Sequence, residues 1–393
     1  MASGNILVQK FGGSSVTMKE RCISKVKNAV NNGYRPVVVV SAIGRYGDPY
    51  ATDTLIKLAK RSCNNVPQKE LDLIMSCGET ISAVVMAGCL RQAGLKAAAL
   101  TGGQAGIITD DSYGSAEIRK VNPVALTSLL CSGYIPVVTG FIGTDLSGDI
   151  TTLGRGGSDI TASVLGRALK AKRIEIYTDV DGIFTADPRI VPDAKILPTV
   201  NYKEIMRLAR RGAGVIHPKC VEIAMKDGIP IVIKNILSND DGTLITYDVP
   251  AKEVIGITHL PAYARINLNL SPEKNPLYNE IINTLAKENI SFDMINIFPY
   301  NLMFTIKEGE AEKVKDILQK YNLNYGIAEN CSRVSVVTGT RKENDNLLTR
   351  MIKALSEKKI EPLQTQDQGN VITCLVKKED TEKAILALHT TFI

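Results

Sequence analysis

The segment that decides the fold is Ile6-Leu7-Val8-Gln9-Lys10-Phe11-Gly12-Gly13-Ser14-Ser15, near the start of a 393-residue chain. Residues 6–11 predict a strand, and two adjacent glycines separate it from a predicted helix over residues 18–31. Adjacent glycines let backbone N–H groups approach an anion closely, and Lys10 adds a full positive charge. The segment therefore predicts a phosphate site, with a plain strand-to-helix turn and a solvated lysine as the alternative. It is not a G-x-x-x-x-G-K-[ST] loop, because the lysine precedes the glycines.

The rest of the first 245 residues continues the alternation of strands and helices. The runs that predict strands are residues 36–40, 96–100, 135–139, 173–178 and 229–233, and those that predict helices are residues 82–93, 159–169 and 221–226. Unbroken apolar runs, such as the four valines at 37–40, suit strands covered on both faces. We expect an αβα sandwich with a mainly parallel sheet over residues 1–245, whose ligands bind beyond the carboxyl ends of the strands.

The last third of the chain contains an internal repeat. Residues 275–290 align with residues 345–360, so that Ile282 meets Ile352 and Leu285 meets Leu355, each 70 residues further on. Each copy reads as strand, helix, strand, strand, helix, and in the first copy these are residues 265–270, 277–285, 292–298, 302–306 and 311–318. The repeat predicts two small ferredoxin-like βαββαβ domains over residues 253–328 and 329–393. Two such domains side by side would bury sheet edges and helix faces that neither domain could cover alone.

Composition excludes several classes of protein. Hydrophobic residues make up 44% and charged residues 22%, which is typical of a folded globular chain. The net charge of +6 is scattered, aromatics are 5% and Trp is absent, so we expect no nucleic-acid partner. The eight cysteines include no C-x-x-C pair, which favours thiols in a reducing compartment. With no leader pattern and no apolar run of membrane-spanning length, we expect a cytoplasmic protein without a membrane partner.

A second glycine-rich segment, Leu153-Gly154-Arg155-Gly156-Gly157-Ser158-Asp159-Ile160-Thr161, opens a predicted helix. Arg155 between glycines has no evident structural role, and a guanidinium group is the natural bidentate partner of a carboxylate or phosphate. Ser158 or Asp159 could instead be a simple helix cap.

Two further segments carry polar residues. Residues 177–189, Tyr-Thr-Asp-Val-Asp-Gly-Ile-Phe-Thr-Ala-Asp-Pro-Arg, form a loop after a buried strand, and their acids, threonines and arginine suit a nucleotide site or only a structured turn. In Ser76-Cys77-Gly78-Glu79, Glu79 is expected to head an apolar helix, where a first-turn acid would complement the helix dipole. The sequence has no HExxH or G-x-S-x-G motif and no His/Cys cluster, which disfavours zinc hydrolysis and serine-triad chemistry.

Taken in this order, the four segments resemble those of the aspartate kinase family within the broader amino-acid kinase fold, and the resemblance spans essentially the whole chain. The C-terminal repeat resembles the paired ACT domains with which these enzymes sense end-product amino acids. The resemblance implies ATP- and Mg²⁺-dependent phosphorylation of the L-aspartate side chain to 4-phospho-L-aspartate. This reaction is the first step toward diaminopimelate, lysine, threonine and methionine. It also implies feedback regulation and a homodimer formed through the ACT domains.

The resemblance also implies roles for individual residues. Lys10 would stabilise the transferring phosphoryl group, Asp159 would orient Lys10 or magnesium, Arg155 would bind the substrate α-carboxylate, and Glu79 would bind its ammonium. The remaining substrate-binding residues would be Thr52, Gly156, Gly157 and Ser158. The nucleotide would meet Lys10, Gly12, Gly13, Ser14, Ser41, Thr178, Asp179, Phe184, Arg189 and Lys219. Phosphates and water would hold most of the magnesium shell, so no protein ligand is assigned.

The regulatory half departs from the family pattern. The Pro-Gly turn typical of ACT effector loops is missing at residues 271–275 and 339–344. Phe292-Asp293-Met294 does match the following strand, so we expect one effector site near Ser271, Asp293 and Met294. Diaminopimelate, lysine and threonine remain open as effectors. The alternative functions are a kinase for another amino acid and a catalytically inactive amino-acid sensor built on a kinase scaffold.

Overall fold

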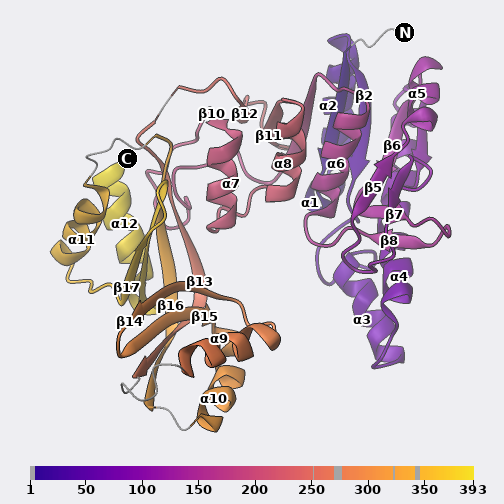
Figure 1. Cartoon of the computed structure of the whole chain (residues 1–393). Helices are drawn as coiled ribbons and strands as arrows, with labels where there is room; N and C mark the ends of the chain where they lie inside the picture. Colours follow the sequence, from indigo (N-terminus) through magenta and orange to yellow (C-terminus); the bar gives the residue numbers. More distant parts are fainter. Residues whose placement is uncertain (1–4, 251, 270–276, 322–323, 341–345) are drawn as a thin grey trace. The chain divides into compact units, whose positions relative to one another are not determined.

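The computed structural model describes the chain except residues 1–4, 251, 270–276, 322–323 and 341–345 (Figure 1). The chain folds into two compact units. The first contains residues 1–183, 196–209 and 214–249, and the second contains residues 184–195, 210–213 and 250–393. The chain thus enters the second unit twice before residue 250, which the sequence pattern did not reveal.

The first unit is built on a sheet of eight strands with β1 (Ile6–Phe11) near its centre. β1 pairs in parallel with both β2 (Arg35–Val40) and β9 (Arg173–Thr178). The full order is β10 (Thr199–Asn201), β12 (Thr243–Thr246), β11 (Ile231–Asn235), β9, β1, β2, β6 (Ile135–Thr139) and β3 (Ala97–Leu100). Only the β11–β12 pair is antiparallel among the described strands of this sheet. The predicted mainly parallel sheet is confirmed.

Helices cover both faces of this sheet. Phe11 and Tyr177 share a buried cluster with Val26 of α2 (Lys19–Asn31) and Met86 of α4 (Gln68–Gln92). Successive strand residues point to opposite faces. Ile174 therefore points away from that cluster, and a Cβ on Gly166 of α6 (Gly157–Ala168) would lie 2.9 Å from it. The other helices of this unit are α1 (Gly13–Val16), α3 (Thr52–Ser62), α5 (Val124–Cys131), α7 (Tyr202–Arg210) and α8 (Pro218–Lys226).

A second sheet of four short strands lies in the first unit and was not predicted. Its order is β5 (Ile118–Val121), β4 (Ile107–Thr109), β7 (Ile142–Thr144) and β8 (Ile150–Thr152). Strands of three or four residues are too short to show a periodic pattern. Asp72 of α4 anchors this sheet, because its carboxylate accepts hydrogen bonds from the backbone N–H of Thr152 at 2.8 Å and of Gly114 at 2.9 Å.

Helix α4 corrects two predictions. It begins at Gln68 rather than at residue 82, so Glu79 lies in its middle and does not head it. Its 25 residues also make it long and apolar enough to cross a membrane by length and composition, although no such run was expected. Half of the apolar window is buried inside the protein, and Asp72 and Glu79 are both buried within the helix. α4 is therefore a core helix of this unit.

The second unit holds one antiparallel sheet of six strands, in which β13 (Val254–Asn269) and β16 (Asn324–Thr338) are the long central pair (Figure 1). The order is β14 (Phe292–Phe298), β15 (Asn301–Lys307), β13, β16, β18 (Val371–Lys377) and β17 (Gln364–Asp367). The helices are α9 (Leu277–Lys287), α10 (Ala311–Lys320), α11 (Leu347–Glu357) and α12 (Thr381–Phe392).

The two predicted copies share their central strands. The second half of β13 pairs with β15 and with the first half of β16, which completes the first βαββαβ fold around the α9 and α10 core. The first half of β13 pairs with the second half of β16 and serves as the last strand of the second copy, around the α11 and α12 core. The second copy therefore needs a strand that precedes the first copy in the chain.

Candidate active site

A cavity of about 650 Å³ opens in the first unit beyond the carboxyl ends of β1 and β2. The predicted residues that line it are Lys10, Gly13, Ser41, Thr52, Glu79, Arg155, Gly156, Gly157, Ser158 and Asp159. They come from the end of β1, the end of β2, the starts of α3 and α6, and the middle of α4. Parallel strands place their carboxyl ends at one edge of a sheet, which explains why segments so distant in sequence meet here.

Lys10 and Asp159 form an ion pair within the cavity wall. Lys10 Nζ lies 2.7 Å from Asp159 Oδ1, and each side chain is 13% exposed. The pair fixes the ammonium group of Lys10 at the end of β1, where part of this group still faces the cavity. Next to this pair, Gly13 lets the chain pack closely on the loop after β2, because a Cβ there would lie 2.8 Å from the carbonyl oxygens of Ala42 and Gly44.

The start of α6 is not capped by a side chain. Its N-cap is Gly156, whose φ of +74° is the left-handed conformation that favours glycine. The hydroxyl of Ser158 meets that of Ser41 at 2.9 Å, while Asp159 pairs with Lys10, so the helix-cap alternative is wrong for both residues. Arg155 just before them is exposed and lines the cavity, and it has no ion pair within the described part of the chain.

Glu79 is a buried carboxylate that faces the same cavity. Only 3% of the residue is exposed, and one oxygen accepts a hydrogen bond from the backbone N–H of Ala42 at 3.3 Å. The other oxygen, Oε2, has no hydrogen-bond partner among the residues that the structure describes. Burial raises the pKa of Glu79 to about 7, while the Ala42 amide and the Thr52 hydroxyl lower it in part. Such a carboxylate is suited to receive an ammonium group.

The predicted nucleotide residues outside the cavity lie in several places. Thr178 ends β9 and Asp179 follows it, and beside them the backbone N–H of Gly12 donates a hydrogen bond to the carbonyl oxygen of Tyr177 at 3.2 Å. Ser14 lies in α1. Lys219 of α8 lines a separate hollow of about 490 Å³. Phe184 and Arg189 belong to the second unit, where the exposed Arg189 pairs with Asp187 at 2.6 Å. The nucleotide-binding roles of these residues stay predictions.

Sequence reasoning missed three charged residues that line the cavity, Arg45, Asp53 and Lys60. Arg45 forms an ion pair with Asp179, which connects the loop after β2 to the loop after β9. The only signal for Arg45 in the sequence was its place next to Gly44 after a strand end.

The structure describes two of the three predicted effector residues, Asp293 and Met294. Ser271 lies outside the described residues. Asp293 and Met294 lie on β14, where the carbonyl of the buried Met294 accepts a hydrogen bond from Gln364. Asp293 pairs with Arg333 at 2.7 Å, a contact that sequence reasoning did not foresee.

Most of the parallel sheet and the cavity at its carboxyl edge lie within residues 5–235, which match the amino acid kinase family model. The protein is therefore a small-molecule kinase by class. Aspartokinase 1 of Bacillus subtilis (strain 168) is 42% identical over 98% of both chains, and the aspartokinase of Geobacillus stearothermophilus is 34% identical over 98% of this chain and 97% of its own. E. coli aspartokinase III in complex with aspartate and ADP has the same fold, with a TM-score of 0.80 at 23% identity over 98% of this chain and 99% of its own. The chain belongs to the aspartokinases of the amino acid kinase family.

Proposed function

We propose that this protein transfers the terminal phosphoryl group of ATP to the side-chain carboxylate of L-aspartate, giving 4-phospho-L-aspartate and ADP. This is the first step toward the aspartate-derived amino acids. The observation that carries the proposal is the pair of unmatched charges in one cavity, Glu79 and Arg155. They complement the ammonium and α-carboxylate of an amino acid. Full-length similarity to aspartokinases supports aspartate as that amino acid.

The reaction needs no general base, because a carboxylate is already ionised at pH 7. The obstacle is the repulsion between this carboxylate and the triphosphate, so catalysis rests on positioning and on neutralising charge. Lys10 supplies a cation at the strand end, and its ion pair with Asp159 holds it there. The backbone N–H groups of Gly13 and Ser14 would meet the phosphates beside it, whereas the N–H of Gly12 donates to the carbonyl oxygen of Tyr177.

The aspartate site would use both charged residues and the loop between them. Arg155 binds the α-carboxylate through two parallel hydrogen bonds, and Glu79 binds the ammonium with its unpartnered oxygen. Thr52 lies beside Glu79, and Gly156, Gly157 and Ser158 shape the wall near Arg155. The side-chain carboxylate of the substrate is then the group left to face Lys10.

In the first unit, the nucleotide would contact Ser41, Thr178, Asp179 and Lys219, whereas the roles of Phe184 and Arg189 rest on the family resemblance alone. Mg²⁺ on the triphosphate supplies further charge neutralisation, as in kinases generally. Asp159 and the hydroxyls of Ser41 and Ser158 are the oxygen donors beside Lys10 that suit such a hard cation. No group of three metal-ligating side chains occurs among the described residues, so the phosphates and water would complete its shell.

The second unit would regulate this activity as a pair of ACT domains that bind an amino-acid effector near Asp293. Diaminopimelate, lysine and threonine are the candidate effectors. A homodimer through this unit is supported by the edge strand β14 and the turn after it, where Ile297, Phe298 and Tyr300 are 55%, 47% and 58% exposed. All eight cysteines are free thiols, which supports a cytoplasmic location.

The test is ADP release from the purified full chain with ATP, Mg²⁺ and L-aspartate, repeated with each candidate effector. We expect turnover with aspartate and inhibition by one effector. N-Acetylglutamate should not be phosphorylated, because its blocked amine cannot pair with Glu79. Equal turnover of N-acetylglutamate would favour another amino-acid kinase. No turnover from folded protein would favour the inactive sensor.

A further inference from the structure

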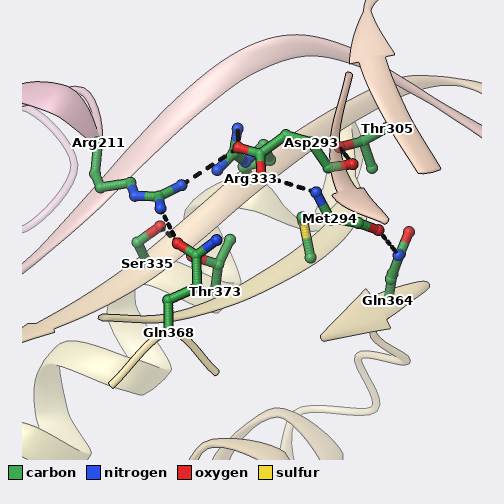
Figure 2. A network of polar contacts seen from close by, with 9 residues as sticks. All are labelled: Arg211, Asp293, Met294, Thr305, Arg333, Ser335, Gln364, Gln368 and Thr373. Atoms are coloured by element: carbon green, nitrogen blue, oxygen red, sulfur yellow. Dashed lines mark hydrogen bonds and ion pairs between the residues drawn. The ribbon is translucent and has the colours of Figure 1, made fainter. Parts of the chain in front are cut away.

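One carboxylate and two guanidinium groups form a cluster in the second unit (Figure 2). Asp293 on β14 faces Arg333 on β16 and Arg211 in the short segment 210–213. Its Oδ2 atom lies 2.7 Å from Arg333 Nη1 and 3.6 Å from Arg211 Nη1. The Asp293 side chain is 37% exposed, so a ligand from solvent can reach it.

The two arginines hold this carboxylate with different strength. Arg333 is 4% exposed, makes the shorter contact and stacks on the ring of Tyr263, whose centroid is 5.0 Å away. Arg211 is more exposed, makes the longer contact and also donates to Gln368 (Figure 2). Burial and the charge of Arg333 lower the pKa of Arg211, which means that its charged form is poorly stabilised here. Arg211 is therefore the partner that another cation replaces more easily.

We propose that Arg211 is an internal competitor for the effector. An amino acid whose ammonium group pairs with Asp293 displaces Arg211, and Arg333 keeps the carboxylate in place during the exchange. The inference rests on the proposed function, because it assumes an amino-acid effector near Asp293. It adds that effector binding frees the segment 210–213 from the sheet of the second unit.

The chain itself connects this segment to the aspartate site. Gly212 holds the segment close to the sheet, because its φ is +115° and a Cβ would lie 2.1 Å from the carbonyl oxygen of His259. His217, six residues after Arg211, caps α8 in the first unit. Its ring packs so closely on Gly156 that a Cβ there would come within 2.5 Å. Gly156 directly follows Arg155, so a displaced segment can disturb the residue that binds the α-carboxylate of aspartate.

The experiment compares Arg211→Gln with Arg210→Gln in the full chain. Arg210 is the exposed neighbour in the same segment, so its variant removes the same charge without touching Asp293. Isothermal titration with L-lysine, L-threonine and meso-diaminopimelate gives effector affinity, and aspartate kinetics with and without effector give the coupling. We expect Arg211→Gln to bind the effector at least about fivefold more tightly than wild type, because the competitor is gone.

Arg211→Gln should also lose the coupling between effector binding and the KM for aspartate. Its KM for aspartate without effector should equal that of wild type at saturating effector, and adding effector should no longer change it. Arg210→Gln should behave as wild type in both measurements. Asp293→Asn should lose effector binding, while it keeps the hydrogen bond that the backbone N–H of Met294 donates to Oδ1 at 2.8 Å.

Wild-type effector affinity in a folded Arg211→Gln variant, or an unchanged effect of the effector on KM, would overturn the proposal. Binding of none of the three amino acids to a wild-type protein that phosphorylates aspartate would also overturn it, and the catalytic function would stand. If aspartate is not phosphorylated, the catalytic function fails, and the titrations still decide whether Arg211 competes with the effector.

Discussion

Glu79→Gln should stabilise the ligand-free protein at alkaline pH while it destroys the aspartate site. The Glu79 carboxylate is 3% exposed, and one of its oxygens has no partner among the described residues. Burial raises the pKa of Glu79 from 4.5 to about 7, so the folded protein resists ionising this group. Glutamine has nearly the same shape and stays neutral at every pH.

The size of the effect follows from the pKa. Each pKa unit corresponds to about 1.4 kcal/mol, so a rise from 4.5 to about 7 corresponds to about 3 kcal/mol. Because the folded pKa is the higher one, the neutral group's contribution is fully present below pH 4.5. It is lost as the pH rises through about 7. Above pH 8, Glu79→Gln should exceed wild type by up to about 3 kcal/mol in unfolding free energy, and near pH 5 this difference should fall below about 1 kcal/mol.

Urea unfolding of both proteins without ligand, between pH 5 and pH 8.5, measures this difference. Glu70→Gln is the control, because Glu70 is an exposed residue of the same helix. It should change the free energy of unfolding little at any pH. Aspartate kinetics on the same samples should show a KM raised by an order of magnitude or more in Glu79→Gln. A free-energy difference that does not grow with pH, or an unchanged KM, would refute the reasoning.

Three further predictions concern single residues. Lys10→Ala should lower kcat by roughly 10²- to 10³-fold and leave KM for aspartate nearly unchanged, as steady-state kinetics would show; an unchanged kcat would exclude its role in the transition state. Arg155→Ala should raise KM for aspartate by roughly 10- to 100-fold through loss of a charge-assisted contact, and a wild-type KM would count against that contact. Asp72→Ala should lower the unfolding free energy by roughly 3 kcal/mol, because the backbone N–H groups of Gly114 and Thr152 lose their acceptor; urea unfolding measures this, and a wild-type midpoint would contradict it.

Much of the fold could be predicted from the sequence because its strands are compact apolar runs between turn residues. The strands β1, β6, β9 and β14 have the bounds that the sequence predicted. The start of α4 was missed because Ser76-Cys77-Gly78 looked like a turn. Gly78 serves packing instead, since a Cβ there would lie 2.6 Å from the carbonyl oxygen of Tyr50. A glycine required by a neighbouring backbone cannot be distinguished in sequence from one required by a turn.

Site residues could be predicted from the sequence where they belong to a local motif. They could not be predicted where only contacts between distant segments bring them to the site. Lys10 and Arg155 were found because each stands among glycines at the end of a predicted strand or the start of a predicted helix. Arg45 and Arg211 were missed because each is an arginine in a polar segment, and their partners are 134 and 82 residues away, at Asp179 and Asp293. Likewise, no local pattern shows that the first half of β13 completes the second repeat.

Helix α4 shows most clearly why the partners of a residue decide its role. Asp72 and Glu79 are seven residues apart, so they lie on the same face of the helix, and both are buried. Asp72 accepts hydrogen bonds from Gly114 and Thr152 through its Oδ2 atom and therefore joins the helix to the second sheet. Glu79 keeps one oxygen unpartnered within the described part of the chain, and burial raises its pKa. A buried carboxylate thus stabilises the fold at Asp72. At Glu79 a carboxylate oxygen stays buried without a partner, which destabilises the ligand-free protein, and the ammonium group of a substrate can pair with this oxygen.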